Sequence, residues 1–188
     1  MNRLTPFYRA TRLPRSLASL LAGLAMMTTV TTVATVITVT TIATLSSVAC
    51  AQSTQLPPQT GLPQGKVEAK GVVFTVDLAQ TRQQQAHGLS GRAHLGSTDG
   101  MLFPYAEKDT YGFWMRAMVI SIDIIWLDNR EVVHIEHNVP APAPGTPDHA
   151  LPSYTPRKPA NFVLEIAAGR AQEIGLRVGD LVRYHLNR

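Results

Sequence analysis

The sequence predicts a mainly β fold: a compact antiparallel β-barrel-like domain with two short helices, preceded by a signal segment. Three observations lead to this prediction. Hydrophobic side chains alternate along several short stretches, helix signals occur at only two places, and the first fifty residues differ in composition from the rest. We therefore expect a signal segment or anchor at residues 1–51, a flexible linker at 52–65 and the β-barrel-like domain at 66–188.

The amino-terminal segment has the order of residues found in a secretory signal. Residues 1–16 are basic and contain no acid, residues 17–49 contain no charge, and small side chains follow in Ala49-Cys50-Ala51. Three alternatives stay open: cleavage after Ala51, lipidation of Cys50, or an uncleaved anchor, since the 33 uncharged residues exceed the roughly 20 that span a bilayer. In each case the protein is exported, to the periplasm or beyond, and only this segment meets the membrane.

The charge balance argues against a nucleic-acid surface. The net charge of +4 equals the contribution of Arg3, Arg9, Arg12 and Arg15, so the remainder is balanced, because 4 minus 4 is 0. Cys50 is the single cysteine, and it precedes the domain. A disulfide framework, a cysteine zinc cluster and a cysteine nucleophile are therefore excluded from the domain.

The first elements follow from short local patterns. Residues 52–65 hold prolines, glycines and glutamines but no charge, so they are expected to stay extended and bury nothing. Residues 72–78 alternate between apolar and other side chains, which predicts a strand with one buried face. Thr81 followed by helix formers and Gly88 predicts a short helix at 82–87.

The later elements are mostly strands. Asp99-Gly100 suits a tight turn into a strand at 101–103, and further strands are predicted at 110–115, 119–127, 131–139, 161–166 and near 182–185. A second short helix is predicted at 168–173. Residues 140–159 contain seven prolines, which fix the backbone and cannot donate to a ladder, so this stretch is expected to be a surface loop.

Five ordered blocks of sequence carry a family resemblance. The chain resembles the DUF192 family, over about residues 67–184, in the blocks Gly88-Leu89-Ser90-Gly91-Arg92, Asp99-Gly100-Met101-Leu102-Phe103, Phe113-Trp114-Met115-Arg116, Ile122-Asp123-Ile124-Ile125-Trp126-Leu127 and Gly175-Leu176-Arg177-Val178-Gly179-Asp180. The resemblance implies a compact β-barrel-like domain with no established activity, cofactor or catalytic residue. The family usually has an asparagine where this chain has Ala117, and a proline where it has Ser121-Ile122. If that asparagine caps a turn or binds something, Ala117 cannot replace it.

Aromatic and sulfur-containing side chains form one candidate contact surface, at Met101, Phe113, Trp114 and Met115. Rigid rings and flexible thioethers are typical of an apolar ligand groove, and equally of a hydrophobic core. Alternate residues of a strand point to opposite faces, so Phe113 and Met115 cannot share a face with Trp114. At least one of these two sets is therefore expected in the core.

Arg92, Asp99 and Asp123 form a candidate polar cluster. Arg92 follows a Gly-Leu-Ser-Gly turn, where a guanidinium suits either an anionic ligand or an internal ion pair with Asp99, Asp123 or Glu165. Asp123 lies among isoleucines, so its carboxylate is expected to be paired, bonded to backbone amides, or raised in pKa and available for proton transfer.

Cofactor and metal chemistry have little support in the sequence. The six histidines are scattered, His134 and His137 project to opposite faces of a predicted strand, and no phosphate loop, dinucleotide fingerprint or nucleophile elbow occurs. We therefore expect no metal and no cofactor, and no catalytic residue is assigned.

The functional hypothesis is a monomeric binding or accessory domain of the cell envelope. Its partner would be an unidentified small molecule or envelope protein, held by the proline-rich loop and the exposed part of the aromatic strands. One alternative is a cofactor-free, hydrolase-like enzyme that acts through Asp123 or Asp99, with Arg92 as anion clamp. Another is a purely structural interaction module.

Overall fold

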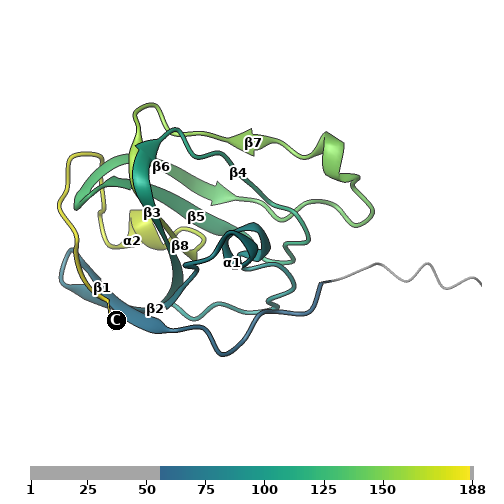
Figure 1. Cartoon of the computed structure of the whole chain (residues 1–188), viewed down its shortest axis with the longest axis horizontal. Coiled ribbons are helices and arrows are strands. Elements are labelled where there is room, and N and C mark those ends of the chain that lie inside the picture. The colour runs from purple at the N-terminus through teal and green to yellow at the C-terminus, as the bar shows by residue number, and fades with distance from the viewer. Residues whose placement is uncertain (1–55, 187–188) are drawn as a thin grey trace, which may run out of the picture. The chain divides into compact units, whose positions relative to one another are not determined.

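The domain consists of one seven-stranded sheet with a two-stranded sheet beside it (Figure 1). The computed structural model describes residues 56–186, so the predicted signal segment, residues 52–55 of the predicted linker and the last two residues lie outside the described part. The main sheet has the strand order β6-β5-β8-β3-β2-β1-β9. Its strands are β1 (Gln64–Ala69), β2 (Val72–Leu78), β3 (Asp99–Asp109), β5 (Ile122–Asp128), β6 (Glu131–Val139), β8 (Ala160–Ala167) and β9 (Arg183–Leu186).

The remaining elements are short. β4 (Phe113–Trp114) pairs with β7 (Ser153–Tyr154), and the helices are α1 (Arg82–His87), α2 (Arg170–Glu173) and the 3-10 turn η1 (Asp148–Ala150). The prediction of a mainly β fold with two short α-helices is therefore confirmed. None of the helices in the described range 56–186 is both long and apolar enough to cross a bilayer.

The predicted barrel closure is wrong. The sheet is open, with β6 and β9 as its outer strands, and an isolated bridge between Glu131 and Leu181 ties the start of β6 to the segment before β9. The sheet is also not purely antiparallel, because β2 and β3 run parallel. The connection between these two strands carries α1, and such a crossover is what returns a chain in the same direction.

Local signals predicted β2 and α1 well, whereas β1 was not predicted, and its residues Gln64 and Gly65 lie in the stretch expected to be linker. Phe74, Val76 and Leu78 are fully buried, as the alternation in β2 predicted. Helix α1 has the predicted bounds and begins with a capping box, in which Thr81 Oγ1 accepts from the Gln84 amide while the Gln84 side chain accepts from the Thr81 amide. The helix ends at His87, and the following Gly88 caps it with a φ of 54°, a conformation that favours glycine.

The middle of the chain is less regular than predicted. The strand expected at 110–115 shrinks to the two residues of β4, and the strand expected at 119–127 begins only at Ile122. A turn lies between them, closed by a hydrogen bond from the Met118 amide to the Met115 carbonyl. Ala117 occupies this turn with a φ of 52°, a left-handed conformation that asparagine and glycine adopt more readily than alanine.

The described part of the predicted linker, residues 56–65, is held against the domain. Gln59 Nε2 donates to the carbonyls of Gln84 and Gly88, at 3.1 and 2.8 Å, and the Pro57 carbonyl lies 2.9 Å from His87 Nε2. Leu62 packs against buried core residues. These contacts differ from the expectation that the segment buries nothing.

Two hydrophobic clusters cover opposite faces of the main sheet. The aromatic–methionine cluster consists of Ala79, Leu89, Leu95, Met101, Phe103, Phe113, Met115, Met118, Ile122, Ile124, Trp126, Val133, Val139, Ala160 and Val163. The aliphatic cluster consists of Val67, Ala69, Phe74, Val76, Leu78, Leu102, Ile125, Leu127, Val132, Leu164, Ile166, Ala171, Leu176 and Val182. Successive side chains of β5 and β8 point alternately into the two clusters, so this part of the sheet is buried on both faces.

Candidate functional site

The structure gives the three predicted polar residues three different sets of partners. Arg92 forms an ion pair of 2.6 Å with Asp77, an acid that the sequence analysis did not single out. Asp99 is exposed, and its Oδ2 accepts from the Gly96 amide at 3.2 Å. Among residues 56–186, no hydrogen bond or ion pair joins Arg92, Asp99 and Asp123 to one another, so these three residues form no shared site.

Asp123 is fully buried and accepts three backbone hydrogen bonds. Its Oδ1 accepts from the amides of Asn138 and Gly169, at 2.7 and 2.9 Å, and its Oδ2 accepts from the Ala171 amide at 2.8 Å. Of the three possibilities left open by the sequence, bonding to backbone amides is the one that this geometry shows. The carboxylate therefore joins the end of β6 and the start of α2 to the sheet.

The aromatic candidates divide as the strand alternation predicted. Met101, Phe113 and Met115 are buried at 0%, 8% and 2% exposure, whereas Trp114 is 45% exposed. Met101, Phe113 and Met115 belong to the aromatic–methionine cluster, where Phe113 makes edge contacts with Phe103 and Trp126. Trp114 is thus the candidate among the four that offers a substantial surface to a partner.

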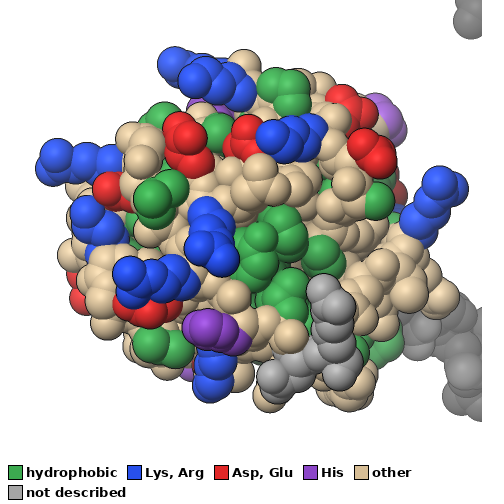
Figure 2. Space-filling model, turned by 60° about the vertical axis from the view of Figure 1, so that its left-hand side comes forward, with side chains coloured by type: hydrophobic (Ala, Val, Ile, Leu, Met, Phe, Trp, Pro, Cys, Tyr) green, Lys and Arg blue, Asp and Glu red, His purple; other side chains and the backbone are tan. Residues whose placement is uncertain are grey.

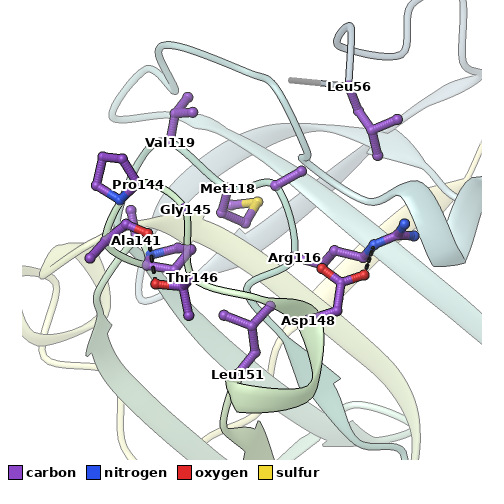
Figure 3. A pocket seen from close by; sticks show the side chains of 13 residues that line it. Leu56, Arg116, Met118, Val119, Ala141, Pro144, Gly145, Thr146, Asp148 and Leu151 are labelled. Carbon is purple, nitrogen blue, oxygen red and sulfur yellow. Dashed lines mark hydrogen bonds and ion pairs between the residues drawn. The ribbon is translucent and has the colours of Figure 1, made fainter. Parts of the chain in front are cut away.

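A groove lies next to this tryptophan, between the turn after β4 and the proline-rich loop (Figure 3). Its volume is about 800 Å³, at the upper end of the range usual for ligand pockets. It is lined by Leu56, Arg116, Ala117, Met118, Val119, Ala141, Pro142, Ala143, Pro144, Gly145, Thr146, Asp148 and Leu151. A smaller groove of about 290 Å³ adjoins it and adds Met115, Pro140, Pro152 and Tyr154 to the lining.

Both walls of the groove are anchored to the rest of the domain. The Arg116 carbonyl accepts from Ser90 Oγ at 2.8 Å, and the Ala117 carbonyl accepts from the Gly91 amide at 2.9 Å. The proline-rich wall is tied down by the pairing of β7 with β4. The groove is therefore formed by loops on a rigid support, where binding residues are commonly found.

One charged pair lies at the edge of the groove. Arg116 Nε donates to Asp148 Oδ2 at 2.8 Å, and the two side chains are 45% and 54% exposed. The guanidinium carbon also lies 5.7 Å from the centre of the Trp114 ring, within cation–π range. In Figure 3 this pair lies on the side opposite Val119 and Pro144.

Glu165 is a second buried acid, on the aromatic–methionine face of the sheet. It lies between Met101 of β3 and Ile124 of β5 in register and is 5% exposed. Its Oε2 finds no hydrogen-bond partner among the described residues. Burial raises the pKa of the Glu165 carboxyl to about 8, so this side chain is mostly protonated at neutral pH.

Sequence reasoning missed several residues of these sites. Asp77 and Asp148 carried no local signal, since each lies in an ordinary strand or loop context, and their partners come from distant segments. Arg116 belongs to one of the blocks that carry the family resemblance, but the sequence did not indicate its contacts with Asp148 and with the exposed Trp114. Within residues 56–186, no group of three His, Cys, Asp or Glu side chains is placed to hold a metal ion.

Comparisons with known proteins agree on the fold and give no activity. The similar solved structures include a protein of unknown function from Novosphingobium aromaticivorans DSM 12444, with 34% identity and a TM-score of 0.57. They also include a proposed transcription regulator from Sinorhizobium meliloti 1021, with 25% identity and a TM-score of 0.56. The matches cover 68% and 67% of this chain and 90% and 98% of those chains. No curated protein matches. The model of the DUF192 family, described as "Uncharacterized ACR", matches residues 65–184, and the chain therefore belongs to the DUF192 family.

Proposed function

We propose that this DUF192 protein is an exported binding domain and that the groove between residues 116–119 and 141–151 is its ligand site. One observation carries the proposal: two loops far apart in sequence are fixed against each other and border an open groove of about 800 Å³ with mostly apolar walls. Concave, mostly apolar sites with few polar groups are the usual form of a small-molecule site. The proline-rich loop forms one wall of this groove, whereas Trp114 is not part of the lining and reaches it only through its contact with Arg116.

Export is the second part of this proposal. It is supported by the order of basic, uncharged and small residues at 1–51, which precedes the described domain. The form cleaved after Ala51 differs in mass from the lipidated and anchored forms. Intact-mass measurement of the protein recovered from the envelope distinguishes a chain that begins at Gln52 from one lipidated at Cys50 and from the full chain.

A role in nucleic-acid binding has less support. The similar Sinorhizobium protein is described as a proposed transcription regulator, but the charge of this chain without its four amino-terminal arginines is zero. Figure 2 shows basic and acidic side chains interspersed over one face. A nucleic-acid surface normally concentrates basic side chains, so we do not extend that description to this chain.

The enzyme alternative also lacks a specific observation in its favour. It required Arg92, Asp99 and Asp123 at one open site, whereas Arg92 pairs with Asp77 and Asp123 is enclosed by backbone amides. A buried carboxylate that already accepts three hydrogen bonds is a poor general base.

A neutral fluorescent probe tests the groove. N-phenyl-1-naphthylamine brightens in apolar sites, and Val119, 39% exposed, lines the groove. We expect Val119→Asp to weaken the binding of this probe to the full chain by about tenfold, since it places a charge on an apolar wall. The matched control is Val178→Asp, because Val178 is 60% exposed and lies outside the groove. Equal binding by the two variants would contradict the proposal.

A further inference from the structure

We propose that the groove takes a small molecule with a hydrocarbon body and a terminal carboxylate, and that Arg116 receives the carboxylate. This inference rests on the proposed function, since it names the ligand class of the same groove. It is argued from the chemistry of the walls, from the contacts of Arg116, and from the position of Asp148.

The walls favour a hydrocarbon body. Nine of the thirteen lining residues carry aliphatic, proline or thioether side chains: Leu56, Ala117, Met118, Val119, Ala141, Pro142, Ala143, Pro144 and Leu151. The hydroxyl of Thr146 donates to the Ala143 carbonyl at 2.7 Å, so it is already engaged within the loop. The body of a matching ligand therefore needs no polar groups, and each buried methylene contributes favourably.

Arg116 gives the groove a positive group with donors to spare. Its Nε donates to Asp148, while its two terminal nitrogens make no hydrogen bond with the described residues. A guanidinium has five N–H donors in a planar fork that fits a carboxylate. The guanidinium carbon lies 5.7 Å from the centre of the Trp114 ring, and the Arg116 carbonyl accepts from Ser90, so the side chain starts from a defined position.

The pair with Asp148 is weak enough to be shared or displaced. Both side chains are about half exposed, and exposed ion pairs typically contribute little to stability. An incoming carboxylate therefore competes for Arg116 at low cost. Asp148 and the ligand anion are both negative and both next to the same guanidinium, so Asp148 opposes the binding that Arg116 favours.

This opposition separates a ligand site from a structural ion pair. If the pair only stabilised the loops, removing either partner would have the same consequence for the groove. If Arg116 receives a ligand carboxylate, loss of Arg116 weakens binding and loss of the Asp148 charge strengthens it. The two effects have opposite signs only for an anionic ligand.

The experiment compares decanoate with decanol as competitors for N-phenyl-1-naphthylamine on the full chain. We expect decanoate to bind the original protein more tightly than decanol does. Arg116→Gln weakens decanoate about fivefold and leaves decanol unchanged, whereas Asp148→Asn strengthens decanoate about twofold. Lys108→Gln is the matched control, because Lys108 is 47% exposed and forms a 2.6 Å pair with Asp128 away from the groove.

Each other outcome overturns a defined part of the account. If decanoate and decanol bind with equal affinity, or if Arg116→Gln weakens the binding of both equally, the carboxylate inference is wrong. The proposed ligand site at the groove is still supported in that case if Val119→Asp weakens the binding of both compounds. If Val119→Asp changes neither, the proposed function fails as well. If Val119→Asp instead converts a dimer into a monomer in sedimentation, a second copy occupies the groove and the ligand proposal is wrong.

Discussion

Two buried carboxylates on neighbouring strands show how differently the two faces of the sheet are built. Asp123 of β5 is opposite Ile166, and Glu165 of β8 is opposite Ile124, so the two acids are one position apart in register but point to opposite faces. Asp123 faces the aliphatic side and accepts three backbone amides. Glu165 faces the aromatic–methionine side, where its Oε2 has no partner in the described chain.

The difference indicates which face is built for stability and which has room for function. On the aliphatic side, the single buried carboxylate organises backbone groups that would otherwise be unsatisfied, and the surrounding side chains are almost all aliphatic. The aromatic–methionine side contains three adaptable thioethers, an acid whose Oε2 has no partner among residues 56–186 and, at its margin, the groove. The proposed ligand groove therefore lies at the margin of the second of these faces.

The largest expected effect tests the role of Asp123. Asp123→Ala leaves the amides of Asn138, Gly169 and Ala171 without their acceptor, and we expect a loss of about 4 kcal/mol in the free energy of unfolding. Urea denaturation at neutral pH measures this loss. Asp128→Ala serves as control, because its partly exposed pair with Lys108 contributes less than about 1 kcal/mol. Similar losses in the two variants would remove the anchoring role of Asp123.

The next effect concerns Glu165 and depends on pH. The folded-state pKa is raised from 4.5 to about 8, so the protonated side chain supports the fold fully below pH 4.5, and this support is lost as pH rises through 8. Glu165→Gln keeps the shape and removes the titration. We expect the variant to gain about 4 kcal/mol over the original protein between pH 5 and pH 9.

Urea denaturation at the two pH values checks this gain. Glu173→Gln is the control, since Glu173 has a 68% exposed side chain and should give the same difference from the original at both pH values. A constant difference for Glu165→Gln would mean that the carboxyl titrates normally and that the contrast between the two acids is wrong.

A smaller effect tests how the aromatic–methionine side is covered by the amino-terminal segment. Gly91 has a φ of 71°, and a Cβ there would overlap the Leu56 carbonyl oxygen. We expect Gly91→Ala to cost about 2 kcal/mol and to displace residues 56–59 from α1. Gly71→Ala is matched in conformation, with a φ of 78° and nothing within 4 Å, and should cost only about 1 kcal/mol. Hydrogen exchange at Gln59 would show no difference between the two variants if the segment does not lie on Gly91.

The smallest effect concerns the turn that forms one wall of the groove. Ala117 has a φ of 52°, which is strained for alanine and tolerated by asparagine. We expect Ala117→Asn to raise the free energy of unfolding by about 0.5 kcal/mol. Ala93→Asn, at an exposed alanine that is not among the positive-φ residues, should give no gain in the same denaturation experiment. A gain at both positions would show that the turn conformation is not its cause.

Much of the fold followed from local patterns because local chemistry determines it. Thr81 and Gln84 determine where α1 begins, and the alternation from Val72 to Leu78 determines which face of β2 is buried. The sheet topology was not predictable in this way. Whether β2 and β3 run parallel, and whether β6 meets β9, depends on pairing between distant segments, which composition and periodicity do not encode.

The candidate site was predicted only in part, for the same reason. Alternation required that Trp114 and Met115 face opposite ways, and the proline-rich stretch had to be a surface loop. Alternation did not tell whether Trp114 or Met115 faces water, because contacts with distant segments determine this. The pairing of Arg116 with Asp148 depends on such contacts as well. Arg92 illustrates the limit, because three acids were considered as its partner and the structure pairs it with a fourth.

Methyl NMR of the six methionines tests the central claim most directly, because they report on the groove, on the core and on the amino-terminal segment separately. Met118 lines the larger groove and Met115 the smaller one, whereas Met101 lies in neither lining and is fully buried. On titration of the full chain with decanoate, we expect the methyl signals of Met118 and Met115 to shift and that of Met101 to stay. Shifts confined to Met26 and Met27, with Met118 unchanged at saturation, would contradict the assignment of the groove as the ligand site.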